Sequence, residues 1–378
     1  MLKKMISIFL VLLFSISFPS YAFAESQPQI SAQAAVLMNA DNGEILFEKN
    51  KDQKRPMAST TKIMTALITL EAAAVNNKVV TITDEMVRVE GSSMGLLPGN
   101  QLTLKSLAAG MLLVSGNDAA NSAAIAIGGS TKAFADLMNK KAAVLNMKNT
   151  HFVTPSGLDD SEHYTTAHDL GILAAAAMKN PDFAKIACEK AMNVQFINPN
   201  QVRRLGNHNK LLSMYDGCVG VKTGFTKKSG RCLVSSAVKN GVQLIAVTLN
   251  APDDWNDHEK MLNYGFTKLK SISVDDSSYS VTLPVVGGTS SSVAARGSEK
   301  TSIVIGVNEE SNLKRTVELP SFVYAPIEAG QVIGAVRYTI GSKTVAKIDL
   351  LAAADVPKLE VKKNIFQIFL DYIKNLLI

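Results

Sequence analysis

The spacing of hydrophobic and polar positions changes several times along this chain, and each change marks a predicted element. Two short apolar runs, residues 34–38 and 44–47, flank a segment that ends in Asn42-Gly43. An Asn-Gly step between two such runs is a strong hairpin signal, because both residues tolerate the positive φ angles of a tight turn. We therefore expect a β-hairpin near the start of the folded chain.

A helical period begins after Pro56. Apolar residues recur every three or four positions to about Ala74, which predicts one long helix. Alanine-rich segments with the same period follow near residues 104–127, 131–146 and 166–179. The middle of the chain is therefore predicted to be mainly helical.

Strand patterns return after this helical middle, at residues 217–225, 231–239 and 242–250. Strands at both ends of a helical segment favour an α/β domain in which one sheet joins the two ends. We assign residues 25–270 to this domain.

The composition changes again from about Ser271. Short runs rich in Val, Ile, Thr and Ser are separated by Gly and Pro, for example at residues 279–286, 301–307 and 331–339. This pattern is typical of short strands joined by turns. It predicts a small all-β sandwich domain over residues 271–355.

The N-terminal residues have the pattern of an export signal. A basic start, residues 1–4, precedes an apolar run, residues 6–18, and the small-x-small tripeptide Ala22-Phe23-Ala24. The apolar run is shorter than the ~20 residues that cross a bilayer, which disfavours the alternative of a retained membrane anchor. We expect residues 1–24 to be a signal peptide and the protein to be exported.

Residues 357–378 are predicted to form an amphipathic helix. On a helical wheel its apolar face consists of Ile365, Ile368, Phe369, Tyr372, Ile373 and Leu376. Lysines and aromatic residues border this face, which favours attachment to a membrane surface. A helix packed on the β-domain is the alternative.

Composition and charge narrow the function classes. A chain of 378 residues with 47% hydrophobic residues is long enough for two folded domains. The formal charge of +6 is mild and the basic residues are dispersed, so a nucleic-acid partner is not expected. The three cysteines have neither the number of a disulfide framework nor the spacing of a zinc site. We expect all three to be buried small apolar residues.

The first candidate for chemistry is Ser59-Thr60-Thr61-Lys62, which opens the first long helix. Residues three apart on a helix share a face, so Lys62 is positioned to take the proton of the Ser59 hydroxyl. The lysine can do so only if burial or a nearby cation keeps its amine neutral. The same spacing at Ser236–Lys239 and Ser311–Lys314 is interpreted as chance, on a strand or loop surface.

Two further motifs follow in order. Ser115-Gly116-Asn117 lies between two helical segments, and Lys222-Thr223-Gly224 lies inside a predicted strand. Ser115 can relay a proton, Asn117 can hold a substrate amide, Lys222 adds a second positive charge and Thr223 can bind a carboxylate. Gly224 is expected to leave room for a substrate along the strand edge. The ordered set of three motifs is typical of penicillin-recognising serine enzymes.

With these motifs the chain resembles the low-molecular-mass penicillin-binding proteins that act as D-alanyl-D-alanine carboxypeptidases. Further matching segments are Leu112-Leu113-Val114, Asp118-Ala119-Ala120, Thr150-His151-Phe152, Ser156-Gly157-Leu158 and Thr166-Ala167-His168-Asp169-Leu170. The resemblance implies a penicillin-binding α/β domain with a helical subdomain, a β-sandwich and an amphipathic C-terminal anchor.

The resemblance also implies a mechanism. Ser59 would attack the carbonyl between the last two D-alanines of a peptidoglycan stem peptide while Lys62 accepts its proton. Ser115 and Lys222 would pass that proton to the departing amine, and the backbone N–H groups of Ser59 and Phe225 would form the oxyanion hole. β-Lactams would acylate the same serine, and neither a metal nor an organic cofactor is needed. The expected location is the outer face of the cytoplasmic membrane.

One position departs from the family pattern. Where relatives often have an arginine that helps to hold the substrate carboxylate, residues 207–212 present His208. We include His208 among the candidate substrate-binding residues, with packing inside its own loop as the alternative. If His208 takes the place of the arginine, Lys222 and Thr223 are expected to carry more of the carboxylate binding.

Three other functions use the same residues or the same fold. A β-lactamase would need a deacylating glutamate between the second and third motifs, whereas Glu259-Lys260-Met261-Leu262-Asn263 comes after Lys222-Thr223-Gly224. A D,D-endopeptidase would share every catalytic residue. A non-catalytic wall-binding protein is disfavoured because all the required side chains are present.

Overall fold

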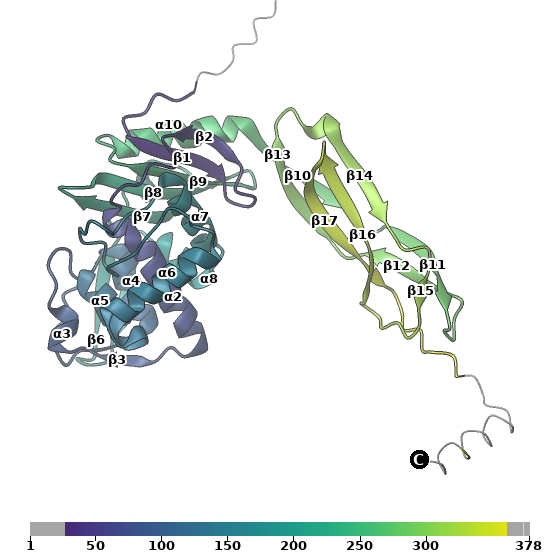
Figure 1. Ribbon diagram of the computed structural model, residues 1–378, viewed down its shortest axis with the longest axis horizontal. Helices are drawn as coiled ribbons and strands as arrows, with labels where there is room; N and C mark the ends of the chain where they lie inside the picture. Colours follow the sequence, from purple (N-terminus) through teal and green to yellow (C-terminus); the bar gives the residue numbers. More distant parts are fainter. Residues whose placement is uncertain (1–26, 361–372, 374–378) are drawn as a thin grey trace, which may run out of the picture.

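The computed structural model describes residues 27–360 and Ile373 of the chain. The predicted signal peptide, residues 1–24, and almost all of the predicted C-terminal helix lie outside the described residues. Within them, a mixed α/β domain is followed by a C-terminal β-domain (Figure 1). The predicted fold class is confirmed for these two domains.

A five-stranded antiparallel sheet forms the centre of the α/β domain. Its strand order is β2-β1-β9-β8-β7, so that the first two strands join the last three. The bounds are β1 Ala34–Asn39, β2 Ile45–Lys49, β7 Cys218–Thr226, β8 Gly230–Lys239 and β9 Val242–Leu249. The predicted hairpin and the predicted single sheet are both confirmed.

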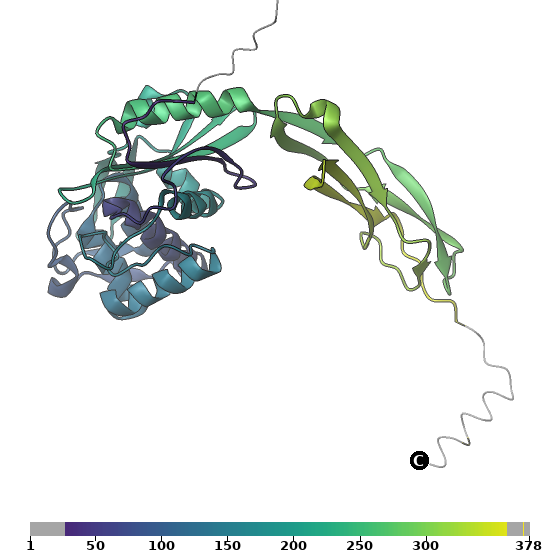
Figure 2. The same ribbon diagram turned by 45° about the horizontal axis from the view of Figure 1, so that its top comes forward.

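Strand β9 lies in the centre of the sheet, and side chains on both of its faces are apolar. Leu244 belongs to the core shared with helix α10, Asp254–Lys268, whereas Ile245 and Val247 belong to the core shared with the other helices. Successive side chains of a strand point to opposite faces, so two covered faces require a nearly continuous apolar run. Figure 2 shows α10 along one face of the sheet and the helical part of the domain on the other.

The helical part begins with a 3-10 turn, Ala58–Thr61, that leads directly into α2. The longer helices are α2 Lys62–Val75, α4 Leu104–Leu113, α5 Asn117–Gly128, α6 Thr131–Val144, α7 Ala167–Met178 and α8 Pro181–Ala187. The shorter elements are α3 Asp84–Val87, α9 Leu211–Met214, β3 Val79–Thr81, β4 Gln101–Thr103, β5 Ala191–Phe196 and β6 Gln201–Gly206. Helices α4, α6, α7 and α8 start at side-chain caps, which are Thr103, Ser130, Thr166 and Asn180.

The β-domain has one apolar core between two sheets. Strands β10 and β13 form a two-stranded sheet, and the other sheet has the order β14-β16-β17-β12-β11-β15. The bounds are β10 Leu269–Asp275, β11 Ser280–Val286, β12 Ser292–Gly297, β13 Lys300–Gly306, β14 Leu313–Glu318, β15 Val323–Tyr324, β16 Val332–Ile340 and β17 Lys343–Ala352. Buried side chains from both sheets, such as Ile303 and Ile348, belong to the same core.

Helix α10 continues into β10 without a loop. Strand β10 begins at Leu269, directly after the last residue of α10, and the Val307 N–H donates to the Lys268 carbonyl at 3.0 Å. The predicted boundary between residues 270 and 271 therefore falls inside β10. The two domains are joined by continuous secondary structure.

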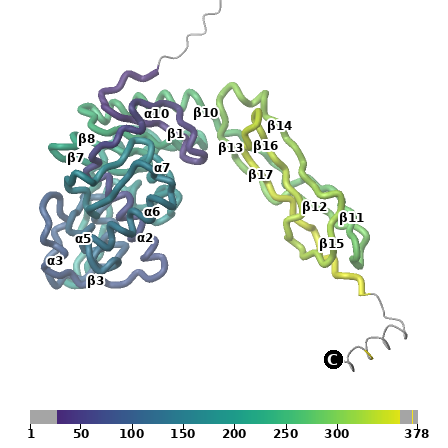
Figure 3. The backbone as a smooth tube through the Cα atoms, in the orientation of Figure 1, coloured from purple at the N-terminus to yellow at the C-terminus, as the bar shows by residue number. Residues whose placement is uncertain are grey.

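The last described segment is extended rather than helical. Lys358 forms a β-bridge with Gly288, and the Leu359 N–H donates to the Gly287 carbonyl at 2.8 Å. The predicted helix, which was expected to begin at residue 357, is therefore wrong for residues 357–360, because their backbone pairs with the loop after β11. Figure 3 shows the chain leaving the β-domain at this end, near β11 and β15.

Two predictions of exposure are also wrong. Ser236, interpreted as part of a surface match, is completely buried in β8, where its hydroxyl accepts a hydrogen bond from Gln243. Cys188 is exposed, whereas all three cysteines were expected to be buried. Both residues lie at positions whose exposure is decided by the neighbouring elements rather than by local pattern.

Candidate active site

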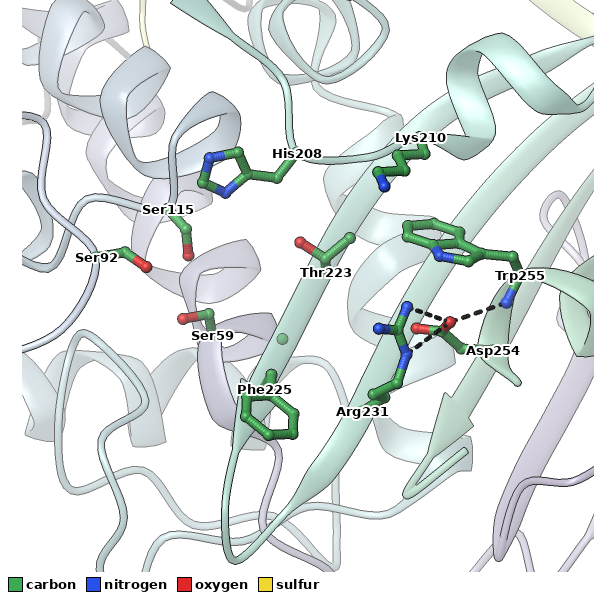
Figure 4. A pocket seen from close by; sticks show the side chains of 11 residues that line it. Ser59, Ser92, Ser115, His208, Lys210, Thr223, Phe225, Arg231, Asp254 and Trp255 are labelled. Atoms are coloured by element: carbon green, nitrogen blue, oxygen red, sulfur yellow. Dashed lines mark hydrogen bonds and ion pairs between the residues drawn. The ribbon is translucent and has the colours of Figure 1, made fainter. Parts of the chain in front are cut away.

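A pocket of about 380 Å³ opens between the 3-10 turn before α2, the α4–α5 junction and strand β7. Six of the predicted site residues line it: Ser59, Ser115, His208, Thr223, Gly224 and Phe225. Five residues that sequence reasoning missed also line it: Ser92, Lys210, Arg231, Asp254 and Trp255. Figure 4 shows Ser59 and Ser115 close together on one side of β7, with Arg231 and Trp255 on the other side.

The turn that presents Ser59 is held by short hydrogen bonds. Ala58, directly before Ser59, has a φ of 48°, which is uncommon for a residue with a side chain. The Thr60 hydroxyl donates to the Met57 carbonyl at 2.6 Å, and the Thr61 hydroxyl donates to the Ala58 carbonyl at 2.8 Å. These two bonds fix the backbone on both sides of the nucleophile candidate.

Lys62 follows this turn directly, as the first residue of helix α2. Its amine is 3.0 Å from the Ser59 hydroxyl and donates to the Ser156 carbonyl at 2.6 Å. The side chain is completely buried, and burial lowers the pKa of Lys62 well below its ordinary value. The positive charge of Lys222 lowers it further, while Asp118 opposes the shift. Burial and Lys222 therefore both favour the uncharged amine that a lysine base needs next to the serine.

Lys222 is the second buried lysine of the site. It lies on β7, the edge strand of the sheet that packs against the 3-10 turn, and its amine donates to the Thr223 carbonyl at 3.0 Å. Burial lowers the pKa of Lys222 to about 7. Near neutral pH this lysine is therefore divided between its charged and uncharged forms, which suits a group that transfers protons.

Ser115 and Asn117 occupy the junction between α4 and α5. Ser115 is buried with a φ of 59°, and this backbone conformation turns the chain between the two helices. The Asn117 amide nitrogen donates to the Glu90 carbonyl at 2.6 Å, whereas its side-chain oxygen is buried without a hydrogen-bond partner among the described residues. A buried unpartnered oxygen is costly unless a ligand satisfies it, so Asn117 has an acceptor available for a substrate amide.

The segment before this junction is shaped by Asp118. Its carboxylate accepts hydrogen bonds from the Met94 and Leu96 N–H groups at 2.8 and 2.9 Å and from the Ser93 hydroxyl at 2.6 Å. These bonds hold the loop that contributes Ser92 to the pocket. The Asp118 match was noted in the sequence, but its partners are 22 to 25 residues away and no local pattern identifies them.

Gly224 has a packing role in addition to the one predicted. A Cβ atom at this position would lie 3.0 Å from the backbone nitrogens of Ser59 and Thr60 and 3.2 Å from the Ala58 Cβ. The missing side chain therefore lets β7 approach the 3-10 turn. Gly224 also lines the pocket, and its predicted role of leaving room for substrate along the strand edge stays a prediction.

His208 lines the pocket from the loop after β6, where its backbone N–H donates to the Leu113 carbonyl at 3.0 Å. Burial and the positive charge of Lys222 lower the pKa of the His208 imidazole below its ordinary value of ~6.5. The imidazole is therefore neutral near pH 7. It cannot replace the fixed charge of an arginine at that pH.

A guanidinium does reach the pocket, from β8. Arg231 pairs with Phe225 across the β7–β8 hairpin, and its Nε and Nη2 atoms donate to one oxygen of Asp254 at 3.0 and 2.6 Å. Asp254 is buried at the start of α10, and the Arg231 guanidinium lies 5.6 Å from the ring centroid of Trp255. The only signal in the sequence for Arg231 was its hairpin register opposite Phe225.

Glu259, the residue that resembles a deacylating glutamate, lies on α10 and does not line the pocket. Its predicted assignment to a helix is confirmed. In the part of the chain that the structure describes, no cluster of three or more His, Cys, Asp or Glu side chains could hold a metal ion.

The site combines a Ser-x-x-Lys pair whose lysine is buried, a Ser-x-Asn junction between two helices and a Lys-Thr-Gly sequence on an edge strand. This combination defines the class of penicillin-recognising serine enzymes. Comparison with known proteins narrows the class. Residues 21–253 match the family model for D-alanyl-D-alanine carboxypeptidase, and residues 266–358 match that for the C-terminal domain of penicillin-binding protein 5. The chain belongs to the D-alanyl-D-alanine carboxypeptidase family.

The relatives span almost the whole chain. D-alanyl-D-alanine carboxypeptidase DacF of Bacillus subtilis (strain 168) is 31% identical over 94% of this chain and 95% of its own length. D-alanyl-D-alanine carboxypeptidase DacA of Haemophilus influenzae is 32% identical over 91% of this chain and 90% of its own length. The crystal structure of penicillin-binding protein 5 from H. influenzae matches with a TM-score of 0.68 and 32% identity, over 88% of this chain and 99% of its own.

The close approach at Gly224 gives a first testable prediction. In Gly224→Ala the new methyl group must push β7 away from the turn, because the nearest atoms are backbone nitrogens 3.0 Å away. We expect acylation by benzylpenicillin to slow by about 10- to 100-fold, as misplacement of reacting groups by a fraction of an ångström typically does. Gly206→Ala is the control, since a Cβ atom at that position would have no other atom within 4 Å. Equal acylation rates in both variants would contradict the assigned role of Gly224.

Proposed function

We propose that this protein is a serine D,D-carboxypeptidase that removes the terminal D-alanine from peptidoglycan stem peptides, and that β-lactams acylate the same nucleophile. The observation that carries the proposal is the 3.0 Å contact between the Ser59 hydroxyl and the buried amine of Lys62. Membership of the D-alanyl-D-alanine carboxypeptidase family supplies the substrate class.

Acylation begins with proton transfer from Ser59 to Lys62. The neutral amine gives one hydrogen to the Ser156 carbonyl, and its lone pair can then receive the serine proton along the 3.0 Å contact. The Ser59 oxygen attacks the carbonyl carbon between the two D-alanines. The backbone N–H groups of Ser59 and Phe225 stabilise the oxyanion, which the close approach of β7 to the turn supports.

The departing amine needs a proton before D-alanine can leave. Ser115 and Lys222 deliver it, with the pKa of Lys222 at about 7 keeping a proton available near neutral pH. The unpartnered oxygen of Asn117 accepts the substrate's amide N–H. Water then hydrolyses the Ser59 ester, which completes one turnover and restores the hydroxyl.

The substrate carboxylate is held by Thr223 and Arg231 rather than by His208. Arg231 carries a charge that does not depend on pH in the working range, and its pairing with Asp254 leaves Nη1 free of any contact to that carboxylate. The neutral imidazole of His208 contributes no charge near pH 7. Lys210, on the same side of the pocket, adds a second cation.

We also propose that the protein is exported and works at the outer face of the cytoplasmic membrane, anchored through residues 361–378. The supporting observation is an exposed apolar cluster where the described chain ends. Tyr324 is 68% exposed beside Val286, Phe322 contacts the Tyr324 ring, and Leu359 is 53% exposed next to Gly287. Aromatic side chains of this kind favour the interface between lipid and water.

The first test of the proposed function uses the nucleophile. Ser59→Ala should abolish both release of D-alanine from a peptide ending in D-Ala-D-Ala and covalent labelling by benzylpenicillin, because the acyl-enzyme cannot form. Ser311→Ala is the matched control, since Ser311 has the same spacing to a lysine but lies in an exposed turn of the β-domain. It should keep full labelling. Labelling that persists in Ser59→Ala would reject Ser59 as the nucleophile.

The carboxylate assignment is tested with substrate and enzyme changed together. Arg231→Gln/Asp254→Asn removes both members of the ion pair, so no buried carboxylate is left unpaired. We expect the KM of a D-Ala-D-Ala peptide to rise about 10-fold or more with little change in kcat, because this contact is made in the ground state and the transition state alike. With a substrate whose terminal carboxylate is an amide, the same variant should differ little from wild type. His208→Gln should leave both KM values nearly unchanged, and a larger effect there would reverse the assignment.

Membrane attachment is tested by truncation after Glu360, which keeps the strand pairing of residues 357–360. The protein comprising residues 25–378 should sediment with vesicles that contain phosphatidylglycerol, and that comprising residues 25–360 should stay in solution. Both should release D-alanine from short peptides at the same rate, because the site lies in the other domain. Equal sedimentation of the two proteins would reject the anchor.

A further inference from the structure

His163 is a buried histidine next to the catalytic turn that the mechanism above does not use. It is 3% exposed, and its Nδ1 atom accepts a hydrogen bond from the Val153 N–H at 2.9 Å and faces the Thr154 N–H at 3.3 Å. A nitrogen that accepts from backbone N–H groups cannot carry a hydrogen itself. The single ring hydrogen is therefore on Nε2.

This tautomer fixes the direction of the next two hydrogen bonds. His163 Nε2 lies 2.8 Å from the Thr61 hydroxyl, so the ring donates and the hydroxyl oxygen accepts. The Thr61 hydroxyl in turn donates to the Ala58 carbonyl at 2.8 Å. The chain of bonds ends on the residue with the positive φ angle directly before Ser59. A strained backbone of this kind persists only where its surroundings hold it.

The loop of residues 153–163, which ends at His163, also contacts the first turn of helix α2. Its Ser156 carbonyl accepts from the Lys62 amine at 2.6 Å, and its Pro155 carbonyl accepts from the Thr65 hydroxyl at 2.6 Å. Gly157 has a φ of 85°, and a Cβ there would lie 2.0 Å from the Ala58 carbonyl oxygen. The loop therefore lies directly on the turn that carries the nucleophile.

We propose that His163 is a positioning residue: by joining the 153–163 loop to Thr61, it holds the Ser156 carbonyl against the Lys62 amine and keeps that amine away from water. The proposal rests on the proposed function in one respect, that Lys62 is the base for Ser59. His163 itself touches neither the substrate nor the reacting atoms.

The charges around the two groups agree with this role. Burial lowers the pKa of His163 to about 4, with Asp160 opposing the shift and His151 and Lys62 adding to it. The ring therefore keeps the neutral tautomer over the range in which the enzyme acts. Around Lys62, burial and Lys222 lower the pKa of the amine, and Asp118 opposes them.

Loosening the loop would let water reach the Lys62 amine. Because burial is the largest cause of its lowered pKa, hydration raises that pKa, and less of the amine is neutral at a given pH. In the pH profile of acylation, the rate rises on the acidic side as the base loses its proton. This rise, the acid limb of the profile, then moves to higher pH. A variant that merely destabilises the fold elsewhere does not move this limb.

The experiment measures the rate of acylation by benzylpenicillin from pH 5 to pH 10 in five proteins: the wild type, two single variants, their double variant and a control variant. His163→Asn keeps an acceptor in place of Nδ1 but loses the donor to Thr61, and Thr61→Val removes the hydroxyl at nearly constant volume. Each should slow acylation by about 10- to 100-fold and move the acid limb up by about half a pH unit or more, with the KM for peptide substrates little changed. The double variant should be no slower than Thr61→Val alone, because that variant already lacks the His163–Thr61 bond and also the bond from Thr61 to the Ala58 carbonyl.

His258→Asn is the matched control. His258 is as fully buried as His163 and bonds the Ser235 and Thr248 hydroxyls, but it belongs to helix α10, away from the turn. It should lower the melting temperature and leave the acid limb unchanged. A wild-type acid limb in both His163→Asn and Thr61→Val, or additive losses of rate in the double variant, would overturn the proposal.

Two readouts separate this proposal from the proposed function. The His163 tautomer and the pKa of the Lys62 amine are both accessible by NMR without any substrate. If wild-type protein fails to be acylated at Ser59, the proposed function is wrong, and a rise in the Lys62 pKa in Thr61→Val still supports the positioning role. If acylation proceeds but the Nδ1 atom carries the hydrogen, the positioning role is wrong and the proposed function stands.

Discussion

The proposed chemistry of this protein depends on keeping one buried lysine uncharged. An ammonium group loses its hydration when it is buried, so the completely buried amine of Lys62 releases its proton far more readily than in water. The protein adds a second lysine beside it, Lys222, whose positive charge acts in the same direction.

Both lysines bind protons more weakly in the folded chain than in the unfolded chain, where the pKa is ~10.4. The unfolded chain therefore binds more protons, and the free energy of unfolding contributed by Lys222 rises as the pH increases from about 7 toward ~10.4. At neutral pH the catalytic lysines thus reduce the stability of the fold that buries them.

The fold satisfies this constraint by closing three backbone segments around the two amines. The edge strand β7 brings Lys222 against the turn of Ser59, and the missing side chain of Gly224 makes the contact close enough. The loop of residues 153–163 covers Lys62 from the other side and gives it a carbonyl partner. Two residues with side chains adopt positive φ angles at the site: Ala58 in the turn and Ser115 at the α4–α5 junction. Such conformations are unfavourable in isolation, so their presence at the site indicates that the tertiary hydrogen bonds around them hold them in place.

Hydrophobic periodicity and motif spacing predicted the sheet, the longer helices and the β-domain, because those elements depend on local pattern and on burial of one face or two. They also predicted the motif residues that meet at the pocket. The predictions failed where position depends on hydrogen bonds between distant segments. Arg231 reaches the pocket through its register opposite Phe225, and the loop of residues 92–96 is held by Asp118. The contact of Gly224 with the turn and the lowered pKa of His208 are also properties of packing, which no spacing in the sequence records.

The same pocket explains why a β-lactam ester on Ser59 would persist. Among the described residues that line the pocket, the only carboxylate is Asp254, and it is bound to Arg231 through two hydrogen bonds. Glu259 lies on α10 outside the pocket, so no free carboxylate is available to activate water. In the proposed mechanism, the group that activates the serine would then also have to activate the water. With a peptide substrate the released D-alanine would leave space for that water. A β-lactam keeps its leaving group tethered within the acyl chain, where it would occupy that space, so deacylation would be slower while acylation uses the same contacts.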